Sequence, residues 1–138
     1  VSTGKTGHAE ALRIVYDTNK VSLPELLDIF FQSHNPTTLN RQGPDFGTQY
    51  RSAVFYNTPE EKQIIEEKIT EYTPFFENPI VTQVIPAQQF YPAEDYHQNY
   101  AEKNPLRYRL YRTSCGRDAS LKELYGKARE GVLKRLLN

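Results

Sequence analysis

Two acidic side chains and a phenol in the first fifty residues could together handle a proton and a polar oxygen: Glu10, Asp45 and Tyr50. Glu10 stands where the chain enters an apolar run, so we expect it to be partly buried. Burial raises the pKa of a carboxyl group, and a carboxylic acid that stays neutral can donate a proton. Each residue also has an ordinary interpretation, as a strand-end glutamate, a turn aspartate or a core tyrosine with a bonded hydroxyl.

The stretch that should hold Asp45 and Tyr50 runs from Asn40 to Ala53, NRQGPDFGTQYRSA. Its glycines and its proline are turn signals, which place Asp45 on a bent loop and Tyr50 at the mouth of the following strand. Loops held on a rigid scaffold often carry binding and catalytic groups. The competing interpretation is a surface loop capped by the aspartate.

Cys115 is the only cysteine in the sequence, which excludes an internal disulfide and fits a reducing compartment. Arg112 and Arg117 flank it, and neighbouring cations lower the pKa of a thiol and favour the reactive thiolate. A single thiol without a partner is, however, more often a small buried side chain than a nucleophile. The sequence leaves both interpretations open.

The three histidines, His8, His34 and His97, could suggest a metal site. Glu94 and His97 even have the i, i+3 spacing of carboxylate-bridged di-iron helices. That architecture needs a second such pair and two further glutamates, which the sequence does not supply. We therefore expect no metal, and we expect His97 to bond into the tyrosine-rich region around it.

Local patterns predict the elements that would position these residues. Ser22 opens a capping box, SLPE, and apolar residues at helical spacing extend this helix to about Ser33. Thr58 and Pro59 begin a second helix in the same way, and Pro74 ends it. Strands are predicted over Glu10–Tyr16, Arg51–Tyr56 and Ile80–Ile85, and further helices over Ala93–Glu102 and from Ala119.

This order predicts an α+β fold, a two-layer sandwich of helices on a small mixed sheet, with residues 1–138 as a single domain and a helical tail from about residue 119. No apolar run is long enough to span a bilayer. From Leu106 onward nine basic residues stand against three acidic ones, and before it eight against fourteen. Basic tails can bind nucleic acid. Because these charges lie on an amphipathic helix, we instead expect the tail to lie on the acidic body, with no nucleic-acid or membrane partner.

Several blocks of the sequence together resemble the A-type peptide methionine sulfoxide reductases. They are TGHAE, HNPTTLNRQGPDFGTQYRSA, FYPAEDYHQNY and KNP, in the family's order and approximate spacing over Val1 to about Arg117. The resemblance implies a mixed sheet with a ferredoxin-like core. It also implies reduction of methionine S-sulfoxide, free or in proteins, without a metal or an organic cofactor. Enzymes of this class reverse methionine oxidation, with one type for each sulfoxide epimer.

By this resemblance, Glu10 protonates the sulfoxide oxygen, Tyr50 hydrogen-bonds that oxygen, and Asp45 positions the substrate. An external thiol reductant such as thioredoxin would complete the cycle, and a cytoplasmic location is expected. Many members end in a glycine-rich tail with recycling cysteines, and this sequence departs from that pattern. A resolving role for Cys115 is therefore a hypothesis.

A larger departure concerns the attacking thiol. The family's nucleophilic cysteine lies in a GCFWG block, which this sequence does not contain, and Ser2 stands where some members have a cysteine. The sequence also lacks methionine and begins inside a motif, so we interpret it as the C-terminal two-thirds of the family's domain and expect no reductase activity from it alone. The alternative is a non-catalytic module that binds oxidised peptides or a partner protein. A hydrolase that uses Glu10 and a histidine has no supporting motif.

Overall fold

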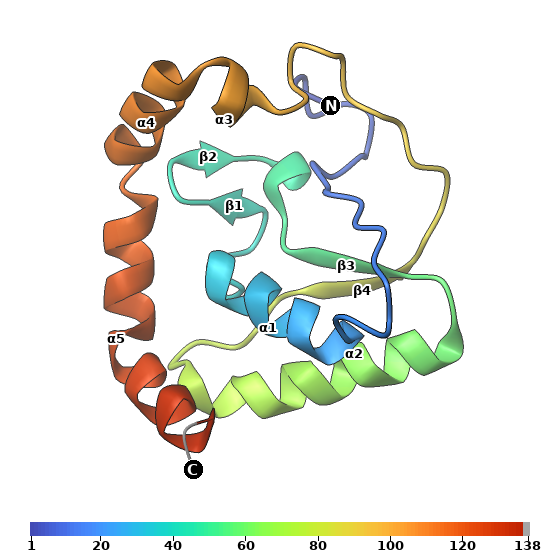
Figure 1. Cartoon of the computed structure of the whole chain (residues 1–138), viewed down its shortest axis with the longest axis vertical. Helices are drawn as coiled ribbons and strands as arrows, with labels where there is room; N and C mark the ends of the chain where they lie inside the picture. Colours follow the sequence, from blue (N-terminus) through green and yellow to red (C-terminus); the bar gives the residue numbers. More distant parts are fainter. Residues whose placement is uncertain (137–138) are drawn as a thin grey trace.

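The computed structural model describes residues 1–136, and the side chains of residues 1–126. Helices run over α1 (Leu23–Ser33), α2 (Pro59–Tyr72), α3 (Tyr100–Lys103), α4 (Pro105–Ser114) and α5 (Arg117–Leu136), and 3₁₀ turns over η1 (Thr48–Tyr50) and η2 (Thr73–Phe75). The strands are β1 (Arg41–Gln42), β2 (Asp45–Phe46), β3 (Ala53–Tyr56) and β4 (Gln83–Pro86). Figure 1 shows α4 and α5 along one side, α2 across the base and the strands between them. Within residues 1–136, every helix is too short or too polar to cross a lipid bilayer.

The strands form two separate pairs among the described residues. β1 and β2 pair antiparallel, with Gln42 opposite Asp45 at the turn. β3 and β4 pair in parallel from Ala53 opposite Gln83 onward, and α2 belongs to the crossover that parallel strands require. Helices combined with both kinds of strand pair confirm the predicted α+β class.

Side chains cap the N-termini of α1 and α2, as the sequence predicts. The hydroxyl of Ser22 accepts a hydrogen bond from the backbone N–H of Glu25, and the carboxylate of Glu25 accepts one from the N–H of Ser22 at 2.7 Å. The hydroxyl of Thr58 accepts from the N–H of Glu61 at 3.2 Å. These bonds satisfy N–H groups that have no partner inside the helix.

The core lies where α1 packs against α2 and α5. Phe31 is fully buried, and its ring stacks on that of Tyr72 with centroids 4.9 Å apart. The hydroxyl of Tyr72 donates to the carboxylate of Asp28 at 3.0 Å, and Lys68 donates to the same oxygen at 2.8 Å. Among the side chains of residues 1–126, the buried hydrophobic ones are Leu27, Phe31, Ile65, Tyr72 and Tyr125.

Side chains rather than a glycine close the C-terminal end of α1. The carbonyl of Phe30 accepts from the hydroxyl of Ser33 at 2.9 Å and from Nδ1 of His34 at 2.7 Å. The hydroxyl of Tyr125 donates to the carbonyl of Phe31 and lies 3.0 Å from that of His34. Because the last carbonyls of a helix have no partner within it, α5 supplies one from the far end of the chain.

A buried tyrosine attaches the helical tail to the body. The ring of Tyr125 meets Phe76 edge-on at 5.5 Å, and α5 contacts α1 and η2. Among the described side chains from Leu106 onward, the ion pair joins Arg112 to Asp118, so both of its partners belong to this C-terminal part. The tail does lie on the body, but up to residue 126 apolar burial holds it there, not the expected pairing with acidic residues. The basic side chains from Lys127 onward lie outside the described side chains.

Three predicted elements differ from the structure. The run Glu10–Tyr16 is not a strand, because a strand needs a hydrogen-bonded partner strand and this run pairs with none of the described strands. Residues 95–99 of the predicted helix Ala93–Glu102 form a turn, and α3 begins only after Asn99 adopts a left-handed conformation with φ 54°. Residues 105–114 form a helix that the sequence analysis missed, because Pro105 begins this helix at a position where proline needs no N–H partner. β3, β4 and α5 begin within three residues of their predicted starts.

Candidate functional site

Side-chain amides hold the loop that leads to Asp45. Gln42 accepts from the N–H of Asn35 at 3.0 Å and donates to its carbonyl at 3.1 Å. The side-chain oxygen of Asn35 accepts from the N–H and the hydroxyl of Thr37 at 2.9 and 2.6 Å. Pro36 is buried, and its carbonyl accepts from the N–H of Val81 at 2.8 Å. The HNPTT block therefore fixes the loop and ties it to the segment before β4.

Gly47 is required by both its backbone and its neighbour. Its φ is 141°, and a β-carbon there would lie 2.1 Å from Oε1 of Gln49. That side chain is buried, and Gly4 also packs against it, where a β-carbon would lie 3.1 Å from Oε1. The two glycines make room for Gln49 between the start of the chain and the loop. Tyr50 follows it as the last residue of η1 and is half-buried.

Backbone hydrogen bonds join the Glu10 segment to the same loop. The N–H of Glu10 donates to the carbonyl of Gln49 at 2.8 Å. The guanidinium of Arg51 donates to the carbonyls of Thr48 at 2.7 Å and Gly7 at 3.2 Å. The structure thus brings the backbone of Glu10 to the residue before Tyr50. The side chain of Glu10 is exposed, which makes the expected partial burial wrong in this chain, because the run that follows it packs under no strand.

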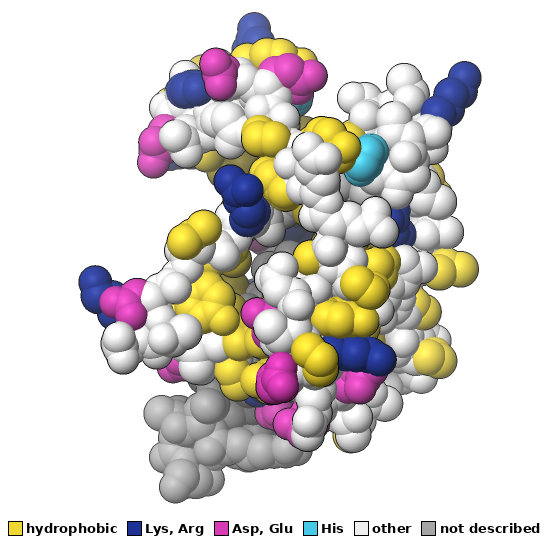
Figure 2. All heavy atoms as spheres, turned by 90° about the vertical axis from the view of Figure 1, so that its right-hand side faces the viewer, with side chains coloured by type: hydrophobic (Ala, Val, Ile, Leu, Met, Phe, Trp, Pro, Cys, Tyr) yellow, Lys and Arg dark blue, Asp and Glu magenta, His cyan; other side chains and the backbone are white. Residues whose placement is uncertain are grey.

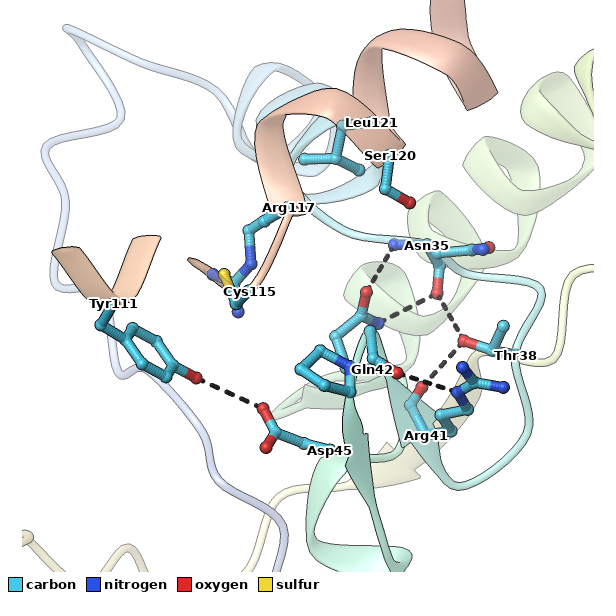
Figure 3. Close-up of a pocket in the computed structure, with 12 residues that line it drawn as sticks. Asn35, Thr38, Arg41, Gln42, Asp45, Tyr111, Cys115, Arg117, Ser120 and Leu121 are labelled. Carbon is cyan, nitrogen blue, oxygen red and sulfur yellow. Dashed lines mark hydrogen bonds between the residues drawn. The ribbon is translucent and has the colours of Figure 1, made fainter. Parts of the chain in front are cut away.

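A pocket of about 190 Å³ lies between this loop and the corner where α4 meets α5 (Figure 3). The loop contributes Asn35, Thr38 and residues 41–45, and the corner contributes Tyr111, Cys115, Arg117, Ser120 and Leu121. Asp45 and Cys115, two separately predicted candidates, therefore line the same pocket. Glu10 and Tyr50 are not among its lining residues, so the candidates come together in two pairs rather than one group.

Tyr111 is a member of this pocket that the sequence analysis missed. Its hydroxyl lies 3.4 Å from Oδ2 of Asp45 and donates to it. Burial and then the negative charge of Asp45 raise the pKa of Tyr111, so the phenol keeps its proton at neutral pH. Tyr111 and Cys115 are four residues apart and so share one face of a helix. Recognising a helix after Pro105 would have predicted that both reach one site.

Cys115 is half-buried at the end of α4, and its thiol donates to the carbonyl of Arg112 at 3.3 Å. The guanidinium of Arg112 itself donates to the carboxylate of Asp118 at 2.9 and 2.7 Å and to the hydroxyl of Tyr108. The positive charge of Arg112 is therefore paired with the carboxylate of Asp118 rather than with the Cys115 thiol. Arg117, unlike Arg112, lines the pocket together with Cys115.

Two of the histidines have separate aromatic partners. The ring of His8 meets Tyr91 edge-on at 5.2 Å. His97 lies in the tyrosine-rich region, 4.2 Å from the ring of Tyr96, with its Nε2 3.8 Å from the carboxylate of Glu94. Within the part of the chain that the structure describes, no three His, Cys, Asp or Glu side chains are grouped as a metal site would group them.

The third histidine, His34, belongs to a buried polar chain behind the loop. Its Nδ1 donates to the carbonyl of Phe30, so its Nε2 is the acceptor for the hydroxyl of Ser52 at 2.7 Å. Ser52 in turn lies 2.8 Å from the hydroxyl of Thr82. Burial lowers the pKa of His34 below its ordinary value, the bond to Phe30 opposes this, and the charge of Arg117 adds to it. The neutral imidazole therefore links α1 to the start of β3.

The lowered pKa of His34 makes stability depend on pH. Between the folded and the unfolded pKa values the unfolded chain binds a proton that the folded chain does not. We therefore expect His34 to leave the free energy of unfolding unchanged above its unfolded pKa of about 6.5. As the pH falls below that value, the free energy of unfolding should decrease. Urea unfolding at a series of pH values from about 7.5 to 5 measures this change. His34→Gln should flatten it and His97→Gln should not, so equal slopes in the two variants would contradict the assignment.

The family model described as peptide methionine sulfoxide reductase matches residues 1–129. The chain belongs to the peptide methionine sulfoxide reductase family. Its relative in Pasteurella multocida, the peptide methionine sulfoxide reductase MsrA, is 55% identical over 105 residues, covering 76% of this chain and 60% of that protein. The MsrA of Deinococcus radiodurans is 48% identical over 128 residues, covering 91% of this chain and 62% of that protein. This member of the family therefore spans about three-fifths of the length of these relatives.

Solved reductase structures share the fold. Mxr1 from Saccharomyces cerevisiae in reduced form superposes with a TM-score of 0.74 at 43% identity, over 76% of this chain and 58% of that chain. The methionine sulfoxide reductase A of Corynebacterium diphtheriae gives a TM-score of 0.72 at 38% identity, over 76% of this chain and 55% of that chain. The four candidate residues Glu10, Asp45, Tyr50 and Cys115 all lie within the stretch that matches the reductase family.

Proposed function

We propose that this chain forms part of an enzyme that reduces methionine S-sulfoxide, free or in proteins, to methionine. The observation that carries the proposal is the junction between TGHAE and GTQYR, made by the bonds from Glu10 to Gln49 and from Arg51 to Gly7. A carboxyl group from one block and a phenol from the other can then approach the same polar oxygen. Membership of the reductase family supports this choice of substrate.

In the proposed reaction, proton and hydrogen-bond donors act on the sulfoxide oxygen, and thiols act on the sulfur. A thiolate attacks the sulfoxide sulfur while Glu10 gives a proton to the oxygen and Tyr50 donates a hydrogen bond to it. The attack joins the two sulfurs, and the protonated oxygen then passes as hydroxyl to the attacking sulfur while the S–S bond and the S–O bond of the substrate break. Methionine leaves as the thioether, and the attacking thiol is left as a sulfenic acid. A second thiol condenses with the sulfenic acid to form a disulfide and water, and an external thiol reductant such as thioredoxin reduces that disulfide.

The attacking thiol is assigned to a part of the enzyme outside these 138 residues. Asp45 would position the substrate, and its pocket gives it a place to do so. A general acid at neutral pH must keep its proton, for which burial is the usual means. Since Glu10 is exposed here, the proposal requires that the substrate and the thiol-bearing segment cover it. The proposed steps use no metal and no organic cofactor.

The test uses a chimaera that joins the part of the Pasteurella multocida MsrA outside the match to this chain. Methionine formation is measured with separate S and R epimers and a dithiol reductant. We expect the chimaera to reduce the S epimer and the 138-residue chain alone to reduce neither. A folded chimaera that turns over neither epimer would contradict the proposal.

We propose Cys115 as the resolving thiol, since it lines the Asp45 pocket and is half-buried rather than enclosed. In the chimaera, Cys115→Ser should still release one methionine per enzyme but should lose most of its steady-state turnover with thioredoxin. Rapid-quench analysis separates the first turnover from the later ones. Ser114→Ala, at the neighbouring residue, is the control. Normal steady-state turnover of Cys115→Ser would remove this role.

A second candidate function is a non-catalytic module that binds oxidised peptides or a partner protein. The exposed Glu10 and the formed pocket around Asp45 favour it for the 138-residue chain alone. Calorimetry with one peptide in its methionine and its methionine sulfoxide forms tests it directly. Preferential binding of the oxidised form, combined with an inactive chimaera, would select the module. In either case we propose a reducing, cytoplasmic setting without nucleic-acid or membrane partners.

A further inference from the structure

The carboxylate of Asp45 is held by a single neutral donor. The hydroxyl of Tyr111 donates to its Oδ2 at 3.4 Å, and no other donor among the described residues bonds to this carboxylate. Arg41 lines the same pocket, but its Nε donates to the carbonyl of Gly43 at 2.8 Å and its guanidinium carbon lies 4.3 Å from the centre of the Phe46 ring. Asp45 forms no ion pair with the described side chains. It therefore keeps its negative charge and leaves Oδ1 free for a ligand.

The hydroxyl of Tyr111, and not the exposure of its ring, distinguishes this residue. The side chain is 52% exposed, but hydrophobic side chains gather in several groups on the face of the molecule that Figure 2 shows, so an exposed ring is common here. In Figure 3 the hydroxyl points across the pocket to Asp45. Partial burial and the charge of Asp45 raise the pKa of Tyr111, so the phenol remains a donor at neutral pH.

This contact fixes something that the local sequence does not. Gly43 has a φ of 56° and Pro44 follows it, so the backbone that leads into Asp45 is set by its own residues. The side chain of an aspartate can still occupy any of several staggered rotamers. Among the described residues, the bond from Tyr111 is the one hydrogen bond that joins residues 111–121 to residues 35–46. A residue from α4 therefore selects the orientation of a side chain on β2.

We infer that Tyr111 is a positioning residue, which holds the carboxylate of Asp45 in the orientation that binds the substrate. Tyr111 acts through Asp45 and does not contact the reacting atoms. Its phenol occupies Oδ2, so Oδ1 accepts a hydrogen bond from a donor group of the substrate. A neutral phenol suits this task, because an arginine could occupy both oxygens and neutralise the charge. The inference rests on the proposed function, in which Asp45 positions the substrate.

The first test measures the orientation of Asp45 without any substrate. Tyr111→Phe removes the hydroxyl and keeps the ring. NMR couplings from Cγ of Asp45 to its backbone nitrogen and carbonyl carbon report the χ1 angle, in the 138-residue chain and in the chimaera. We expect couplings of one rotamer in the parent proteins and averaged couplings in Tyr111→Phe. Unchanged couplings in both variant proteins would overturn the inference.

Tyr108→Phe is the matched control for this measurement. Tyr108 lies on the same helix, and its hydroxyl accepts from the guanidinium of Arg112 at 3.1 Å rather than donating to Asp45. Its replacement also removes one bonded hydroxyl from α4, so it should leave the Asp45 couplings unchanged. Averaged couplings in both variants would show that α4 as a whole, and not the Tyr111 hydroxyl, orients Asp45, which would also overturn the inference.

The second test measures turnover of the S epimer by the chimaera. Tyr111→Phe should raise KM about three- to tenfold, the effect of one hydrogen bond, and should leave kcat within about twofold. In an Asp45→Ala background the same replacement should change KM by less than about twofold, because the residue through which it acts is gone. An equal rise of KM in both backgrounds would mean that Tyr111 has only a structural role.

Failure of the inference can be distinguished from failure of the proposed function. An active chimaera whose KM does not respond to Tyr111→Phe would overturn the inference alone. A chimaera that reduces neither epimer would contradict the proposed function, and the Kd of a methionine sulfoxide peptide, measured by calorimetry, then replaces KM. Weaker binding in Tyr111→Phe that disappears in the Asp45→Ala background would still support the inference. Absence of binding as well as turnover would overturn both.

Discussion

Replacing Phe31 with alanine should lower the free energy of unfolding by about 3–5 kcal/mol. Phe31 is 0% exposed and packs between helices, with its ring stacked on Tyr72 at 4.9 Å. Its removal loses the transfer free energy of a large aromatic side chain and leaves a cavity that the surrounding helices cannot fill. Equilibrium urea unfolding followed by circular dichroism measures the change.

The matched control for this prediction is Ile29→Ala on the same helix. Ile29 is 64% exposed, so its replacement should change the free energy of unfolding by about 0.5 kcal/mol or less. A similar loss in both variants would show that the α1–α2 contact is not the stability core. Phe31→Leu should fall between alanine and the native residue, because leucine fills part of the same volume.

Replacing Glu10 with glutamine should lower kcat of the S-epimer-reducing chimaera by about 10²- to 10⁴-fold. Glutamine keeps the shape of the side chain but cannot transfer a proton to the departing oxygen. The loss should appear mainly in kcat, since the substrate contacts assigned to Asp45 are retained. Initial rates over a range of methionine sulfoxide concentrations measure both constants.

Glu77→Gln is the control for Glu10→Gln, because Glu77 is also exposed and lies in the segment after η2. It should leave kcat within about twofold of the parent chimaera, far from the loss expected for the acid. If Glu10→Gln kept normal kcat over the whole pH range, the assignment of Glu10 as the acid would be wrong.

The helices that the sequence predicted well are those whose boundaries are set locally. Ser22 and Thr58 cap their helices with their own side chains, so four neighbouring residues are enough to place each start. The run Glu10–Tyr16 shows the opposite case. Its residues favour a strand, but a strand forms only against a partner, and the partner is not encoded in the run. The helix that begins at Pro105 was missed for a third reason, since proline both ends helices and begins them.

The candidate site also has features that local sequence patterns predict and features that depend on distant residues. Glycine and proline signals predicted the turn at Gly43 and Pro44, because these residues act on their own backbone, but Asp45 is the first residue of β2 and not part of the bent loop itself. The contact between Tyr111 and Asp45 joins residues that are 66 positions apart, and no local pattern in either block points to the other. The exposure of Glu10 also could not be predicted from its neighbours, since burial depends on what packs over the run.

The hydrogen bond from the hydroxyl of Tyr125 to the carbonyl of Phe31 can form only late in the synthesis of the chain. Tyr125 follows Phe31 by 94 positions, so a ribosome that adds about 5–20 residues per second makes the tyrosine about 5–20 s after the carbonyl it serves. Throughout that interval water must satisfy the carbonyl of Phe31, whereas the carbonyl of Phe30 can already bond to the neighbouring side chains of Ser33 and His34. The packing of α1 on α2 can form as soon as α2 has been made, whereas the contact of α5 with α1 must wait until residue 125 has been made.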